Sequence, residues 1–124
     1  MEMSRRSKQV AGAIQVELAD LLRRELNDPR LQAVGWITVS DVEIAQDHRN
    51  ANVYVSFMGK EEKSPEVQEA MKALKHSAAF LHRALVKRLS LKSIPHLNFK
   101  FDRSFDHADK VARAMNEAKA SSEE

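Results

Sequence analysis

Residues 36–58 read WITVSDVEIAQDHRNANVYVSFM, and this stretch decides the fold. β-Branched residues are frequent in its first half, and apolar residues alternate in the second at Val53, Val55 and Phe57, which is typical of strands. The polar segment between the halves is turn-like, so the stretch predicts an antiparallel hairpin. Because the alternation of the first strand slips near Asp41, we expect a β-bulge or a bend there.

A helix is expected before the hairpin. Apolar residues recur at intervals of three and four over residues 7–26, the pattern of an amphipathic helix. Asn27, Asp28 and Pro29 end this helix, because proline has no amide hydrogen and disfavours helical geometry at the residue before it. We therefore expect a turn after the helix.

A longer helical region is expected after the hairpin, over residues 64–91. Ser64, Pro65 and Glu66 provide an N-cap oxygen, a proline at the first helical position and an acid near the positive end of the helix dipole. Apolar residues spaced by three or four then form one stripe that should face the core. These are Val67, Met71, Leu74, Ala78, Leu81, Leu85 and Leu89.

The remainder of the chain predicts a third strand and a weaker helix. Residues 96–101, HLNFKF, alternate with Leu97, Phe99 and Phe101 inward. A weak apolar pattern predicts a short helix from Asp106 to about residue 119, followed by a frayed tail. We therefore expect a domain at residues 1–105 and a C-terminal helix and tail at residues 106–124.

The predicted order is helix, strand, strand, helix, helix, strand, with the strands covered by helices in an α+β arrangement. This order is shared with the type II KH domain, an RNA-binding fold. The length of 124 residues allows one such domain, and the absence of cysteine excludes disulfides and thiolate metal sites. No stretch approaches the roughly 20 apolar residues of a membrane span, and the basic N-terminus lacks a signal-peptide core. We therefore expect a cytoplasmic protein with no membrane partner.

Basic residues are concentrated in residues 70–101, which contain no aspartate or glutamate. A solvated helix face usually mixes both signs of charge, so this run predicts a polyanionic partner, in particular RNA. The candidate RNA-binding residues are Lys72, Lys75, His76, Arg83, Lys87, Arg88 and Lys92, together with Arg30 after the first helix. For Arg30, contact with a phosphate and pairing with a neighbouring acid both remain open.

The sequence contains no glycine-rich phosphate loop, nucleophile elbow or paired-acid motif. His76 and His82 are six residues apart, which is not the four-residue spacing of helical zinc ligands. We therefore predict no enzyme activity, no metal, no cofactor and no small-molecule substrate. Trp36 and Tyr54 could stack on bases, but core packing or contact between sheet and helix is the favoured interpretation.

Five segments, taken in order, resemble the ribosome-binding factor A family. They are NDPRL at residues 27–31, ITVSDV at 37–42, ANVYVSF at 51–57, SAAFLHR at 77–83 and IPHLNFKFDRS at 94–104. The resemblance implies a KH-like fold in which a helix is interrupted around an Ala-x-Gly motif. The matching positions are Ser77, Ala78 and Ala79, so the glycine of the motif is absent.

The resemblance also implies a function without catalysis. The protein would bind the immature small (30S) ribosomal subunit and assist processing and folding of its ribosomal RNA, with a link to growth in the cold. We expect it to act as a monomer. The alternative, from another class of function, is a protein-interaction module that docks a partner through its acidic hairpin and C-terminal region.

Overall fold

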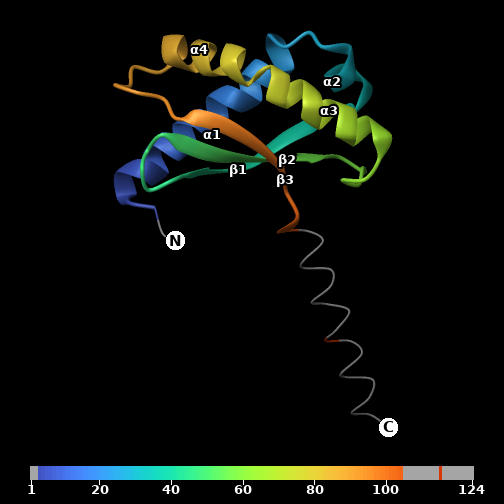
Figure 1. Cartoon of the computed structure of the whole chain (residues 1–124), viewed down its shortest axis with the longest axis horizontal. Coiled ribbons are helices and arrows are strands. Elements are labelled where there is room, and N and C mark those ends of the chain that lie inside the picture. The colour runs from blue at the N-terminus through green and yellow to red at the C-terminus, as the bar shows by residue number, and fades with distance from the viewer. Residues whose placement is uncertain (1–2, 105–114, 116–124) are drawn as a thin grey trace.

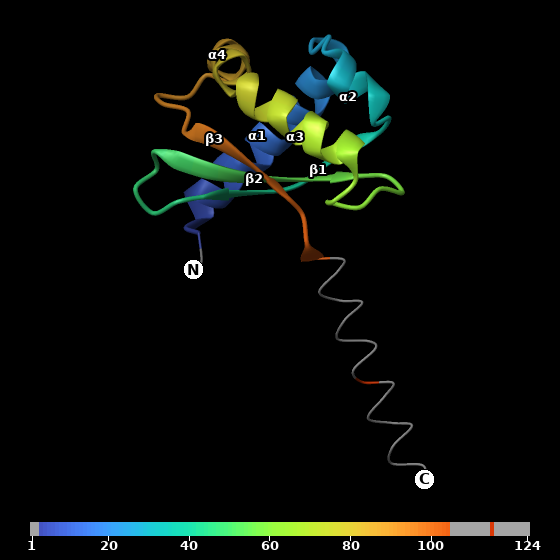
Figure 2. The same ribbon diagram turned by 45° about the vertical axis from the view of Figure 1, so that its right-hand side comes forward.

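The computed structural model describes residues 3–104 and Met115 of the chain. The described elements are α1 (Arg5–Arg24), α2 (Pro29–Ala33), β1 (Ile37–Ile44), β2 (Asn50–Phe57), α3 (Pro65–His76), α4 (Ala78–Arg88) and β3 (His96–Phe101). The helices gather over one face of the sheet (Figures 1 and 2). The predicted KH-like α+β class is therefore confirmed, whereas the predicted C-terminal helix and the boundary near residue 105 lie outside the described residues.

The three strands form one sheet in the order β1-β2-β3. β1 and β2 are antiparallel, as the hairpin pattern predicts, and β3 is parallel to β2. A parallel neighbour requires a long crossover connection, which α3 and α4 supply. Both helices consequently lie against the sheet, and they bring the basic part of the chain to one side of the molecule.

The predicted bulge is present in β1. Val39 pairs with Val55 and Asp41 pairs with Tyr54, so that Ser40 is the additional residue. The Ser40 hydroxyl donates a hydrogen bond to the Tyr54 carbonyl oxygen over 3.1 Å. This extra residue shifts the alternation, and apolar side chains therefore face the core on both sides of the bulge.

The predicted stripe on α3 and α4 faces the core. Val67, Leu74, Leu81 and Leu85 are fully buried, and the remaining three residues of the stripe are partly buried. The stripe packs against the inward side chains of the sheet and of α1 in one apolar cluster. The opposite face of both helices is left to the solvent.

The expectation of a simple turn after Pro29 is wrong, because a five-residue helix, α2, begins at this proline. The Asp28 carboxylate accepts a hydrogen bond from the Arg30 amide over 2.9 Å and so caps the new helix. Proline is tolerated at the first position of a helix, because an amide hydrogen at that position would have no acceptor within the helix. The same three residues thus separate two helices rather than a helix and a loop.

Core packing of Trp36, one of its favoured interpretations, is also wrong. Trp36 is 51% exposed and lies directly before β1. The Arg23 guanidinium of α1 lies over the ring, 4.9 Å from its centroid, so Trp36 contacts a helix through a cation–π interaction.

The predicted helix interruption is found at Ser77, between α3 and α4. The ψ angle of Ser77 is 0°, whereas an α-helix has about −42°. Its amide hydrogen bonds to the carbonyl oxygens of both Ala73 and Leu74, at 3.0 and 3.1 Å. Its φ angle is −91°, which any residue can adopt, so the bend does not require a glycine. Ala78 and Ala79 begin α4 directly after it.

Candidate nucleic-acid interface

The last two turns of α3 carry three of the predicted cationic residues. Lys72, Lys75 and His76 are exposed and share one helix face, because residues three and four apart lie on the same side. Lys72 is partly compensated by Glu69, since its Nζ lies 3.3 Å from Glu69 Oε1. The carboxyl end of α3 favours the positive charge of Lys75, and His76 lies beside it next to the interruption.

The exposed face of α4 combines cations with an aromatic ring. Arg83 and Lys87 are one helical turn apart and both are exposed. Phe80 shares this face, three residues before Arg83, and its side chain is 41% exposed. Aromatic rings beside cations are typical of surfaces that bind single-stranded RNA by stacking and phosphate contact. The sequence analysis did not select Phe80, although its spacing from Arg83 and Lys87 carries the signal.

The structure gives Arg88 a structural role that the sequence analysis missed. Its guanidinium forms ion pairs with Asp20 and Glu25 at 2.7 Å and with Glu17 at 3.1 Å. The carboxylates of Asp20, Glu25 and Glu17 raise the pKa of Arg88, and the hydrogen bond from Arg88 lowers the pKa of Asp20. This cluster joins the end of α4 to α1, so we leave Arg88 out of the interface.

Arg30 is likewise paired with a neighbouring acid, as one of its two open interpretations expects. Its Nη2 lies 2.9 Å from Asp28 Oδ2, and its Nε donates to Asp28 Oδ1 over 3.2 Å. The hydrogen bond from Arg30 lowers the pKa of Asp28 and raises that of Arg30 itself. Lys92 is exposed, but it lies in the loop between α4 and β3. The predicted set is thus divided between an exposed helix face, two ion-paired arginines and a separate loop.

Replacing Arg88 with alanine should destabilise the fold at pH 7, because three carboxylates would then lie close together with only the exposed Arg24 beside Asp20. Since the folded state lowers the pKa of Asp20 below 3.8, this contribution is complete above that value and is lost as the pH falls through the folded pKa. Urea unfolding at pH 7 and pH 3 should show a large loss that shrinks in acid. Arg24→Ala, which removes a 78% exposed partner of Asp20, should cost less. Equal midpoints for Arg88→Ala and the unmodified protein at pH 7 would contradict this role.

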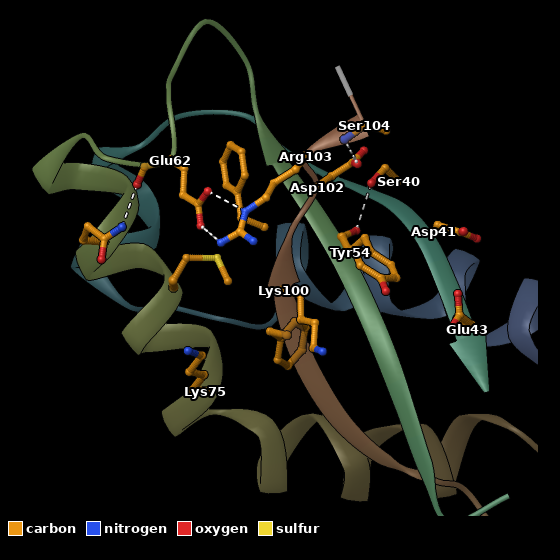
Figure 3. A pocket seen from close by; sticks show the side chains of 14 residues that line it. Ser40, Asp41, Glu43, Tyr54, Glu62, Lys75, Lys100, Asp102, Arg103 and Ser104 are labelled. Carbon is orange, nitrogen blue, oxygen red and sulfur yellow. Dashed lines mark hydrogen bonds and ion pairs between the residues drawn. The ribbon is translucent and has the colours of Figure 1, made fainter. Parts of the chain in front are cut away.

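A broad open hollow of about 920 Å³ lies across the edge of β3, between α3 and the outer face of the sheet (Figure 3). Its lining mixes both signs of charge, and the Glu62 and Arg103 side chains form an ion pair at 2.8 Å. The carboxylates of Asp41, Glu43 and Asp102 also face it. The described lining holds four acids and three basic residues, so the hollow offers a phosphate no net positive field.

Within the described part of the chain, no group of three or more histidines and acids is arranged to hold a metal ion. None of its helices is long and apolar enough to cross a membrane. The exposed face of α3 and α4 is therefore the surface that we take forward. We call it the basic helix face and define it by Lys72, Lys75, His76, Phe80, Arg83 and Lys87.

The sheet, its helical layer and this face define a KH-like α+β domain that presents cations on an interrupted helix. The sequence model of ribosome-binding factor A matches residues 6–115. The chain belongs to the ribosome-binding factor A family.

Relatives and solved structures agree with this assignment. A ribosome-binding factor A of Cupriavidus pinatubonensis is 39% identical over 118 residues, covering 95% of this chain and 90% of that relative. One of Thermomicrobium roseum is 40% identical, covering 92% and 84%. The crystal structure of ribosome-binding factor A from Thermus thermophilus aligns with a TM-score of 0.65 at 26% identity, covering 79% of this chain and 97% of that one. A homology model of the Thermus thermophilus ribosome-binding factor A, fitted into a cryo-EM map of a complex with the 30S subunit, aligns with a TM-score of 0.61 at 27% identity, covering 78% and 96%.

Proposed function

We propose that this protein binds the immature small ribosomal subunit through its ribosomal RNA and assists RNA processing and subunit maturation without catalysing a reaction. The observation that carries the proposal is the basic helix face, where exposed cations flank Phe80 on an interrupted helix. The Thermus thermophilus relative fitted into a complex with the 30S subunit supports the same partner. By this proposal the protein acts as a monomer in the cytoplasm and supports growth in the cold.

Binding of the full chain to isolated small subunits at increasing salt concentration tests the proposal. If about four to six cations meet phosphates of single-stranded regions, the log–log slope should have a magnitude of about 3 to 5. Isolated large subunits serve as the control and should bind much more weakly. Affinity that does not change with salt, or equal binding to both subunits, would contradict the proposal.

Phe80→Ala should weaken binding to the small subunit by about tenfold, because stacking of one base on an aromatic ring contributes about 1–3 kcal/mol. The fold should lose little, since the ring is already partly exposed. Val16→Ala is the control, because Val16 is 68% exposed on α1 and lies outside the basic helix face. An equal effect of both substitutions on the dissociation constant would show that Phe80 does not stack on RNA.

A protein-interaction module remains the second candidate function. The observation in its favour is the hollow of Figure 3, where Asp41 and Glu43 from the hairpin face open space together with Asp102. A basic protein partner would fit these carboxylates. Asp41→Asn with Glu43→Gln should leave binding to the small subunit intact if RNA is the partner, and should abolish it if a protein docks on the hairpin.

A further inference from the structure

A second cationic surface lies at the far end of α4, away from the interruption at Ser77. An open cavity of about 250 Å³ is lined there by the first turn of α1, the turn between β1 and β2 and the loop after α4. Each of these segments contributes one basic side chain, namely Arg6, His48 and Lys92. None of the described residues that line the cavity is an aspartate or glutamate, so its electrostatic character differs from that of the hollow in Figure 3.

Hydrogen bonds hold the walls of this cavity together. The Ile44 amide donates to the sulfur of Met3 over 3.2 Å, which ties the chain before α1 to the end of β1. The His96 amide donates to the Arg49 carbonyl oxygen over 2.8 Å, which ties the hairpin turn to β3. These contacts fix the relative positions of segments that are distant in sequence.

The loop after α4 is fixed by a pair of histidines. The His82 Nε2 lies 2.7 Å from the Ile94 carbonyl oxygen, and this nitrogen must be the donor because the oxygen can only accept. The His82 ring also stacks on His96, with 5.6 Å between the ring centroids. Lys92 is therefore carried by a loop that is anchored on both α4 and β3.

His48 occupies a backbone conformation that normally favours glycine. Its φ angle is +60°, and it is the one residue other than glycine with a positive φ in the described part of the chain. A side chain in this region costs conformational energy, and such residues are often found where the side chain has a function. A glycine or asparagine would satisfy the turn more easily, whereas only the histidine brings a basic ring to the cavity.

The cavity lies just beyond the carboxyl end of α4. Arg83 and Lys87 point away from the core along this helix, and Lys92 follows in the next loop. The 11 residues of α4 span about 16 Å, so the basic helix face and the cavity are close enough to contact one strand. The positive end of the α1 dipole adds to the field at Arg6.

We propose that this cavity is a second RNA-contact site, in which Arg6, His48 and Lys92 bind a backbone phosphate of the strand held by α4. It rests on the proposed function, because the phosphate belongs to the same RNA partner. It goes beyond that function by adding a binding site formed by the start of α1, the turn between β1 and β2 and the loop after α4. Because phosphates carry no sequence information, its contribution should be the same for different RNA sequences.

The double variant Arg6→Gln and Lys92→Gln tests the site in binding of the full chain to small subunits. We expect affinity to fall by about tenfold and the magnitude of the log–log salt slope to fall by about 1, for the one phosphate contact that is lost. The matched control is Arg5→Gln with Lys8→Gln, which removes the same charge from exposed residues of α1 that do not line the cavity. An equal loss of affinity in both double variants would show that net charge alone accounts for the effect, and would overturn the site.

His48→Gly provides an independent test with a different signature. The substitution should keep or raise the melting temperature, because glycine adopts the positive φ freely, and it should nevertheless weaken binding by a few-fold. Unchanged affinity with raised stability would overturn the role of His48. If substitutions on α4 abolish binding while both cavity variants bind normally, the proposed function stands and the second site is wrong. If substitutions on α4 have no effect either, the proposed function itself fails.

Discussion

Reversing two charges on α4, with Arg83→Glu and Lys87→Glu, should weaken binding to the small ribosomal subunit by on the order of a hundredfold. Both side chains are exposed, and the described structure gives neither a carboxylate partner. The new glutamates would repel phosphates that the native cations attract, and two counterion-releasing contacts would be lost. The dissociation constant for isolated small subunits, measured at two salt concentrations, checks the expectation.

The matched control is Lys63→Glu with Lys100→Glu. These lysines are exposed on the loop before α3 and on β3, and their reversal changes the net charge by the same amount. The control should bind within a few-fold of the unmodified protein, because its charges lie off the basic helix face. Comparable losses in both variants would show that the overall charge of the protein, rather than α4, determines binding.

Leu81→Ala should reduce the free energy of unfolding by about 2–5 kcal/mol, a large part of the stability of a small domain. Leu81 is fully buried in the first turns of α4, directly after the interruption, and it belongs to the single apolar core. Its removal leaves a cavity under the helix that carries Arg83 and Lys87. Urea unfolding followed by circular dichroism measures the loss.

Val86→Ala serves as the comparison on the same helix. Because its side chain is 51% exposed, we expect a change within about 0.5 kcal/mol. Below the unfolding midpoint, Leu81→Ala should still bind the small subunit, since it alters no exposed group. Similar unfolding curves for the two variants would mean that α4 is not anchored through Leu81.

Local patterns were sufficient to predict most of the fold. The strands alternate strictly except at Ser40, and the slip in that alternation marks the bulge that the structure shows. The start of α3 follows from its cap at Ser64, whose side chain accepts from the Val67 amide. The parallel pairing of β3 with β2 was not predicted, because it is a contact between segments that are far apart in sequence.

Short helices and exposed apolar residues were harder to predict. α2 has only five residues, too few for an apolar period, and the proline that begins it was interpreted only as the end of α1. The exposure of Trp36 was not predicted either. Its hydrophobic character indicates burial, but in the structure Arg23 covers one side of its ring. Composition alone does not show which apolar side chains stay at the surface.

The candidate site was predictable as a charge run but not as a surface. Arg88 belongs to the same acid-free segment as Lys87, yet its carboxylate partners lie 63 to 71 residues earlier in the chain. Lys92 is likewise separated from its neighbours Arg6 and His48 in sequence and joins them only through the fold. Charge counting predicts a polyanion partner, while the assignment of each cation requires the tertiary structure.

Sedimentation of cell extract on a sucrose gradient, with and without ribonuclease, tests the central claim most directly. The account predicts that the protein travels with free small subunits and not with mature ribosomes. It also predicts that ribonuclease treatment returns the protein to the top of the gradient, because RNA provides the contact. A complex that keeps the protein at the same position after the ribosomal RNA has been digested would contradict the account and would assign the chain to a protein partner.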